Sequence, residues 1–190
     1  MGLRQTEKLG RCVELAVADS DFNRRDLLSM GYSGAEVLPI LIPWEDYEQP
    51  AQRAALREFG DGRRNILFVG RVVPNKKFED VIAAFACYRQ RYDPTARLIL
   101  AGGQDTVPGY VRRLQEYCRA LGEENVIFTG KIPFSRLLAL YRTASAFLCM
   151  SEHEGFCVPL LEAMYFHVPV VARAAGAVPE TLGDAAVLLP

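Results

Sequence analysis

The sequence lacks the features of several common protein classes. Its 22 lysine and arginine residues nearly balance its 23 aspartate and glutamate residues, so no basic excess points to nucleic acid or an anionic membrane. Its apolar runs are far too short for a membrane-spanning helix. Residues 1–8 lack the apolar core of a signal peptide. We therefore expect a cytoplasmic protein without nucleic-acid partners.

Metal-binding clusters are also missing from the sequence. It has five cysteines, none in a Cys-x-x-Cys pair: Cys12, Cys87, Cys118, Cys149 and Cys157. Their odd number and long spacings predict reduced, mostly buried thiols. The two histidines, His153 and His167, do not accompany a cysteine cluster, so we expect no metal site.

Two nucleotide-binding motifs are absent as well. The loop after the first regular strand lacks Gly-x-Gly-x-x-Gly, which argues against a dinucleotide redox site. No Gly-x4-Gly-Lys-Ser/Thr sequence marks a P-loop. Any nucleotide must therefore be held by other residues.

The sequence does contain a regular alternation of strands and helices from Asn65 onward. Six apolar segments are predicted as strands: 66–69, 97–101, 126–129, 146–150, 169–172 and 186–189. Helices are predicted between them over 78–92, 110–121, 135–143 with Ser135 as N-cap, 159–166, and a short piece from Pro179. Continuous apolar strands indicate burial on both faces. We predict an α/β fold: a Rossmann-like parallel sheet with helices on both faces, truncated at both ends.

The first 64 residues are less regular. We predict a helical stretch within 4–15, a strand within 12–18, a helix from Ser20 or Asp21 to near Gly31, extended chain over 35–43, and a helix over 51–59. We divide the chain into the tail of a preceding domain (1–43), a connection (44–64), and a main domain (65–190) that is incomplete at its C-terminal end.

An acidic turn, residues 151–157, comes after the strand at 146–150. It places Glu154 at the carboxyl end of a strand, where ligands bind in open α/β sheets. Glu162 lies about one turn into the next helix, which Pro159 suits at its start. The two acids suit an acid–base pair across a glycosidic bond, or two holders of vicinal hydroxyls. The structural alternative is a helix-dipole partner and an exposed helix residue. We interpret His153 as a turn residue and Cys157 as a packing residue.

A basic loop, residues 70–77, comes after the first strand of the main domain. Gly70 allows a close turn, and Arg71 and Lys76 lie beside a helix N-terminus. Two cations at a helix end suit a diphosphate. An ordinary solvated basic loop is the alternative.

These segments resemble the C-terminal, donor-binding half of a retaining family 4 (group 1) glycosyltransferase with the GT-B fold. Four segments match in order: 68–77, 126–132, 154–164 and 168–180. The resemblance implies that Arg71 and Lys76 bind the donor diphosphate and stabilise the leaving group. It implies that Glu162 holds the ribose and that Glu154, with the amides of Gly155 and Phe156, positions the sugar. Glu154, Arg71 and Lys76 are thus the catalytic candidates.

The resemblance also defines the rest of the donor site and the reaction. Gly70 belongs to the diphosphate segment, and Lys131 and Ile132 to the segment whose backbone meets the base. The donor would be a UDP-, GDP- or ADP-sugar, with no metal and no other cofactor. Residues 1–43 would be the tail of the acceptor-binding domain, through which a sugar, lipid or small-molecule acceptor reaches the full-length protein. The resemblance allows peripheral association of the full-length protein with the inner face of the membrane.

Two alternative functions remain open: a non-catalytic nucleotide-sugar-binding module, and a GT-B-fold epimerase or phosphorylase. We expect the 190 residues alone to be inactive in sugar transfer. The sequence departs from the family pattern at three places: Lys77, Cys157 and Phe166–His167, where many members have glycine or small residues.

Overall fold

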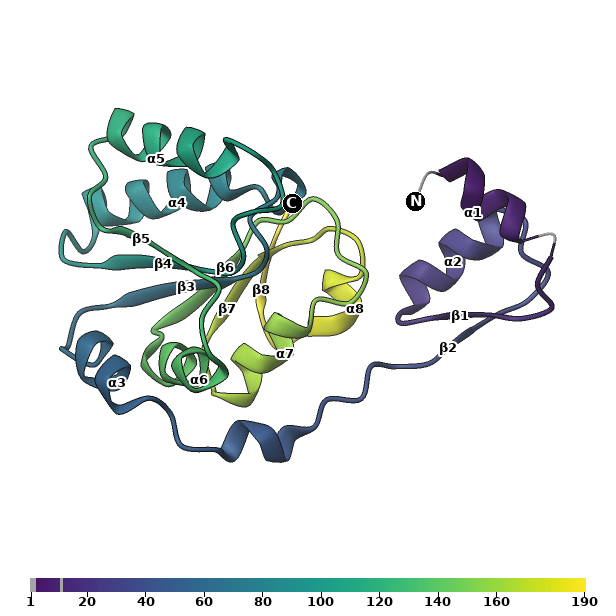
Figure 1. Ribbon diagram of the computed structural model, residues 1–190, viewed down its shortest axis with the longest axis horizontal. Helices are drawn as coiled ribbons and strands as arrows, with labels where there is room; N and C mark the ends of the chain where they lie inside the picture. Colours follow the sequence, from purple (N-terminus) through teal and green to yellow (C-terminus); the bar gives the residue numbers. More distant parts are fainter. Residues whose placement is uncertain (1–2, 11) are drawn as a thin grey trace.

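The computed structural model describes residues 3–10 and 12–190 and is built around a six-stranded parallel sheet (Figure 1). The strand order is β5-β4-β3-β6-β7-β8. Their bounds are β3 (Asn65–Val69), β4 (Arg97–Ala101), β5 (Val126–Gly130), β6 (Ala146–Cys149), β7 (Val170–Arg173) and β8 (Val187–Leu189). Every pairing is parallel, which confirms the predicted fold class.

Helices cover both faces of this sheet, as the continuous apolar strands predicted (Figure 1). One face carries α4 (Phe78–Arg91) and α5 (Tyr110–Ala120). The other carries α3 (Arg53–Phe59), α6 (Phe134–Thr143) and α7 (Val158–Tyr165), and the short α8 (Val178–Leu182) precedes β8. The helix ends lie within two residues of the predicted ones. The N-cap of α6, however, is Pro133 and not Ser135. The extended backbone of Pro133 starts the helix one residue early, so Ser135 lies inside it.

The core explains why these segments fold as they do. All five residues of β4 are buried, since this strand has a neighbour on each side and helices on both faces. Helix α4 turns Phe78, Val81, Ile82 and Phe85 toward the sheet, each no more than 1% exposed. Each such burial contributes about 1.5 to 3 kcal/mol relative to exposure in water.

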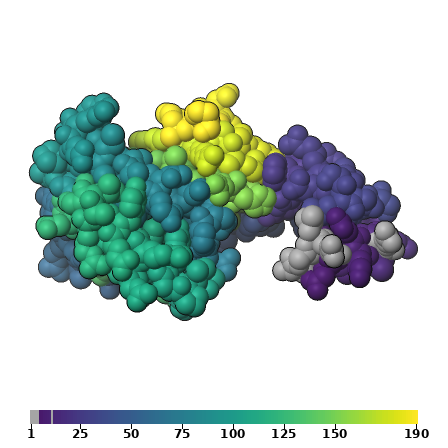
Figure 2. Space-filling model, turned by 90° about the horizontal axis from the view of Figure 1, so that it is seen from above, coloured from purple at the N-terminus to yellow at the C-terminus, as the bar shows by residue number. Residues whose placement is uncertain are grey.

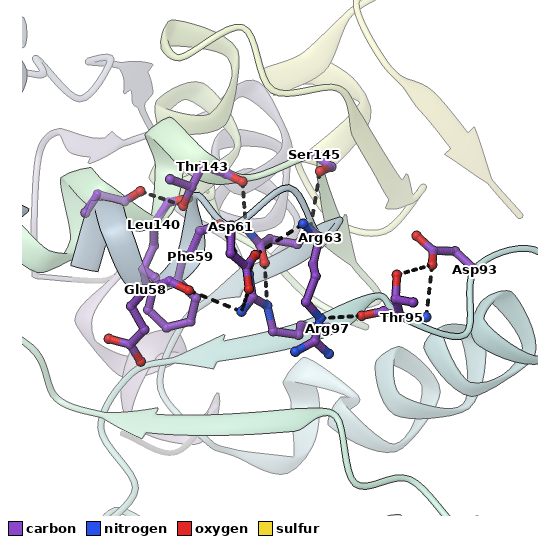
Figure 3. Close-up of polar contacts among 12 residues, drawn as sticks. Glu58, Phe59, Asp61, Arg63, Asp93, Thr95, Arg97, Leu140, Thr143 and Ser145 are labelled. Carbon is purple, nitrogen blue, oxygen red and sulfur yellow. Dashed lines mark hydrogen bonds and ion pairs between the residues drawn. The ribbon is translucent and has the colours of Figure 1, made fainter. Parts of the chain in front are cut away.

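A buried polar cluster closes the amino end of the sheet (Figure 3). Arg97, at the start of β4, pairs with Asp61 at 2.7 Å and donates to the Asn65 side-chain oxygen at 2.9 Å. The side-chain amide of Asn65 donates to the carbonyls of Phe59 and Thr143, each at 2.8 Å. The cluster joins the ends of α3 and α6 to the central strands. A buried guanidinium is tolerated because its donors are satisfied. The carboxyl edge of the sheet is left for other roles.

The N-terminal segment forms a smaller unit with two parallel strands, β1 (Ala16–Ala18) and β2 (Ala35–Val37), and two helices, α1 (Leu3–Leu9) and α2 (Asp21–Ser29). The Ser20 hydroxyl accepts from the Asn23 amide at 3.2 Å, which confirms the predicted N-cap. A 3-10 helix, η1 (Trp44–Glu48), was not predicted. This unit meets the main domain beside its C-terminal third (Figure 2). There the Glu180 carboxylate accepts from the amides of Asp21 and Phe22 at 2.6 and 3.0 Å.

The cysteines correct one prediction. All five are free, but only Cys118 and Cys149 are buried, while Cys12 and Cys87 are exposed. Cys87 lies on the solvent side of α4, outside its apolar stripe. Within residues 3–10 and 12–190, none of the helices has the length and apolar character needed to cross a bilayer.

Candidate functional site

The strand order places a topological switch point at the carboxyl edge of the sheet, where ligands bind in such folds, and we call the region around it the crevice. Strand β3 lies next to β6, and the chain continues from them toward opposite sides of the sheet. The loops after two such strands separate and leave room for a ligand. In this chain the loop after β3 is the basic loop, and the loop after β6 is the acidic turn. They meet through a hydrogen bond from the Glu152 amide to the Asn75 carbonyl at 2.9 Å.

Lys76 and Glu154 form the centre of the crevice. The Lys76 Nζ atom lies 2.6 Å from both carboxylate oxygens of Glu154. The Glu154 residue is 6% exposed, and the Lys76 side chain is 21% exposed. Beside them Lys77 pairs with Glu152 at 2.9 Å, and this hydrogen bond raises the pKa of Lys77. The loops are thus joined by two ion pairs, one shielded from water and one at the surface.

Arg71 reaches the same edge but remains unpaired. Its side chain is exposed, and no acid among the described residues pairs with it. The backbone around it is fixed, because the Val72 amide donates to the Gly103 carbonyl at 2.9 Å. A Cβ atom at Gly102 would lie 1.9 Å from the Gly70 carbonyl oxygen, so only glycine allows the two loops to approach this closely. The loop thus holds the Arg71 backbone in place, and its guanidinium has no ion-pair partner among residues 3–10 and 12–190.

A third loop supports Glu154 from behind. The Ala177 amide donates to the Glu154 carbonyl at 2.9 Å. Gly176 adopts φ +61, and a Cβ there would lie 2.4 Å from the same carbonyl oxygen. The Thr181 hydroxyl donates to the Phe156 carbonyl at 2.6 Å. The backbone of Glu154 to Phe156 is therefore held by the segment that leads into α8.

Glu162 is buried. It is therefore not the exposed helix residue that the alternative interpretation of the two acids expected. It is 7% exposed and accepts hydrogen bonds from the hydroxyls of Tyr47 and Tyr141, each at 2.5 Å. Burial, followed by the carboxylate itself, raises the pKa of both tyrosines, so both stay protonated donors. Each carboxylate oxygen keeps a second acceptor position for a ligand hydroxyl. Sequence reasoning missed these tyrosines because each lies far from Glu162 along the chain.

A small hollow lies on the other side of the basic loop. It has a volume of about 130 Å³ and is lined by Val69, Ala101, Gly102, Gly103, Lys131, Ile132 and Leu137. These residues come from the carboxyl ends of β3 and β4, from the loop after β4, and from the chain beyond β5 into α6. Lys131 and Ile132 thus lie at the predicted edge. The lining is mainly backbone and apolar side chains, which suits the flat face of a base.

The three departures from the family pattern share one conformation. Among the described residues, the non-glycine residues with positive φ are Lys77, Cys157 and His167, at 51°, 68° and 56°. Left-handed backbone is natural for glycine and strained for other residues. The side chains at these positions are therefore kept at a cost in stability.

Cys157 has a partner that the sequence did not suggest. It is the N-cap of α7, and its sulfur lies within 4.8 Å of the Cys149 sulfur at the end of β6. The neighbouring Cys157 thiol lowers the pKa of Cys149. The proximity of Cys149, together with burial, raises the pKa of Cys157. The sequence held one hint of this proximity. Cys149 ends the strand before the acidic turn, and Cys157 begins the helix after it.

Comparison with known sequences identifies relatives of this chain. The profile described as "Glycosyl transferases group 1" matches residues 49–189. The GDP-mannose-dependent alpha-(1-6)-phosphatidylinositol monomannoside mannosyltransferase of Mycolicibacterium smegmatis is 36% identical over 191 residues, which cover 93% of this chain and 48% of the relative. The O-antigen chain mannosyltransferase B of Escherichia coli is 29% identical over 157 residues, covering 80% and 36%. The chain thus spans about half, or less, of the length of these relatives.

Solved structures share the fold. Anabaena Alr3699/HepE, in complex with UDP and glucose, matches with a TM-score of 0.84 at 23% identity over 98% of this chain and 52% of that one. Sucrose-phosphate synthase of Thermosynechococcus elongatus matches with a TM-score of 0.82 at 23% identity, covering 99% and 48%. Because the profile covers most of the sequence and the sheet has the expected GT-B form, the chain belongs to the group 1 glycosyl transferase family.

Proposed function

We propose that this chain is the donor-binding part of an enzyme that transfers a sugar from a nucleoside-diphosphate sugar to a hydroxyl acceptor, with retention of configuration and without a metal. The observation that carries the proposal is a buried Lys76–Glu154 pair at the same edge of the sheet as Arg71, which has no ion-pair partner among the described residues. A diphosphate is the ligand class that matches two cations at the edge of such a sheet.

In the proposed reaction the bond between the sugar carbon and the diphosphate oxygen breaks, a bond to the acceptor oxygen forms, and the proton of the acceptor hydroxyl passes to the departing diphosphate. Negative charge grows on the leaving diphosphate, where Arg71 and Lys76 stabilise it. Lys76 then moves from a carboxylate partner to a phosphate partner. This frees the Glu154 oxygens to accept from sugar hydroxyls, while the amides of Gly155 and Phe156 donate to the sugar.

The proposed positions of base and ribose depend on the rest of the edge. The base occupies the hollow beside Lys131 and Ile132, and the ribose hydroxyls donate to the remaining acceptor positions of Glu162. We propose GDP-mannose as the first donor to test, because several relatives are named as GDP-mannose-dependent. The acceptor lies outside the part of the enzyme that these 190 residues form.

The test is calorimetric titration of the chain with GDP, UDP, ADP and guanosine. We expect GDP to bind best. Arg71→Ala should weaken GDP binding by about 10- to 100-fold, since a hydrogen bond to a charged group contributes about 1.5 to 3 kcal/mol, and should leave guanosine binding unchanged. Arg112→Ala is the matched control, because Arg112 is an exposed arginine whose ion pair with Glu116 is long, at 4.0 Å.

Two results would contradict the proposal. One is that none of the three diphosphates binds at millimolar concentration. The other is equal loss of GDP and guanosine binding in Arg71→Ala, which would remove Arg71 from the phosphate site. We further expect the isolated 190 residues to bind donor without transferring sugar; measurable turnover by the isolated chain would refute that expectation.

A further inference from the structure

Three potential metal ligands lie together inside the acidic turn. They are the sulfur atoms of Cys149 and Cys157 and a carboxylate oxygen of Glu154, all within 4.8 Å of one another. Cys149 is 1% exposed and Glu154 6%, and Cys157 is half-buried. In the part of the chain that the structure describes, no other group of three histidine, cysteine or acidic residues gathers this closely. The predicted absence of a metal site depended on sequence spacing, which concealed this cluster.

Cys157 occupies its position at a cost. Its backbone is left-handed at φ 68 and ψ 64, and its side chain makes no capping hydrogen bond to α7. Such a conformation is destabilising for a non-glycine residue. A strained residue that points its thiol at a second thiol and a carboxylate suggests a role for the side chain itself.

The donor set suits a thiophilic divalent ion. Zinc binds cysteine sulfur at about 2.3 Å and takes tetrahedral geometry, so two ligand atoms lie somewhat under about 4 Å apart. The observed spacing reaches this by small side-chain rotations. Calcium and magnesium prefer sites built from oxygen alone, so two sulfur donors select against them.

The Lys76 ammonium helps to balance the charge of the proposed ion and its three ligands. Two thiolates and one carboxylate carry three negative charges, which a divalent cation and the Lys76 ammonium balance. Lys76 contacts both Glu154 oxygens, and each oxygen has a second acceptor position. One oxygen can therefore bind the ion while the other keeps its contact with Lys76.

We propose that Cys149, Glu154 and Cys157 form a binding site for zinc or a similarly thiophilic divalent cation at the edge of the donor crevice. The site does not depend on the proposed function. If that function is also correct, the ion and the donor sugar compete for Glu154, and each weakens the binding of the other by the same factor.

The test titrates cobalt(II) and zinc into the reduced chain carrying Cys12→Ser and Cys87→Ser, which removes the two exposed thiols. We expect saturable binding with sulfur-to-cobalt charge-transfer absorption, displaced by zinc. Cys157→Gly should weaken binding by more than about 100-fold, because even the outer partners of metal ligands are worth about 10- to 100-fold. This variant should fold well, since glycine accepts the left-handed backbone. Cys118→Ser, which removes a buried thiol outside the cluster, should bind as the parent does.

The outcomes separate the two proposals. Absence of cobalt absorption, or equal binding by parent and Cys157→Gly, overturns the metal site. So does a disulfide between Cys149 and Cys157 in the oxidised protein together with no metal binding after reduction. Zinc binding that GDP-mannose does not weaken would support the metal site and count against the assignment of Glu154 to the sugar.

Discussion

The ammonium group of Lys76 lies equally close, at 2.6 Å, to the two oxygens of Glu154, although 78 residues separate them. The contact joins the first loop of the main domain to the fourth, across the position between β3 and β6 where the strand order reverses. It gives the buried Glu154 carboxylate a counter-charge. A ligand phosphate that attracts Lys76 therefore also alters the environment of Glu154.

The first prediction concerns this ion pair. Lys76→Met leaves a buried carboxylate without its counter-charge and should lower the free energy of unfolding by about 2 to 4 kcal/mol. Adding Glu154→Gln should recover part of the loss, with a coupling energy of about 1 to 3 kcal/mol. Urea denaturation of the two single variants and the double variant measures the coupling. Lys77→Met, which breaks the exposed pair with Glu152, should change stability less; strictly additive effects at 76 and 154 would contradict the prediction.

The second prediction concerns alkaline pH. The folded-state pKa values of Tyr47 and Tyr141 lie above the ordinary value of 10.0. The folded protein therefore binds these protons more tightly than the unfolded chain. Their contribution to stability is complete below pH 10 and is lost as the pH rises through the folded-state values.

Tyr47→Phe tests this dependence. The variant should lose about 1 kcal/mol at neutral pH, because one hydrogen bond to Glu162 is missing. It should then lose less than the parent when the pH is raised above 10. Denaturation midpoints at several alkaline pH values measure the difference. The same slope in parent and variant would show that the hydroxyl does not titrate as the structure indicates.

The third prediction concerns the loop behind Glu154. Gly176→Ala combines left-handed strain with a collision against the Glu154 carbonyl, and should cost roughly 2 to 4 kcal/mol. Gly62→Ala is the matched control, since Gly62 has φ +88 and open space around it; its cost should be about 1 kcal/mol. Thermal denaturation compares the two variants. Equal losses of stability in the two variants would mean that the loop around Gly176 accommodates the added methyl group without displacing Glu154.

The fourth prediction uses the strained residues. His167→Gly should raise the free energy of unfolding by about 0.5 to 1.5 kcal/mol, because φ 56 suits glycine. Glu124→Gly, at an exposed position with ordinary φ, should instead lower it by a smaller amount through greater freedom of the unfolded chain. Urea denaturation distinguishes the two signs. Destabilisation by His167→Gly would indicate that the imidazole makes a compensating interaction.

Much of the main domain was predictable because its signals are local. Strands such as 97–101 are short apolar runs between glycines and charged residues, and α4 shows helical spacing from Phe78 onward. Parallel strands also bring all their carboxyl ends to one edge, which placed Arg71 and Glu154 together. The element η1 was missed because it depends on distant contacts, including the hydrogen bond of Tyr47 to Glu162.

The partners within the candidate site were less predictable. The sequence indicated two cations and two acids at one edge, but it did not indicate that Lys76 contacts Glu154 while Arg71 stays unpaired. Side-chain pairing depends on rotamers and on loop backbone that short motifs do not determine. The same holds for Cys149 and Cys157, whose sulfur atoms come within 4.8 Å of each other only because the turn between them folds back.

The segment from Gly176 to Glu180 connects two parts of the molecule at once. One end supports the Glu154 carbonyl through the Ala177 amide, and the other end holds the start of α2 through the Glu180 carboxylate. A rotation of the N-terminal unit therefore acts on the same short segment that supports the Glu154 carbonyl. The relative position of the two units and the position of Glu154 are thus coupled through five residues, of which the last three begin α8.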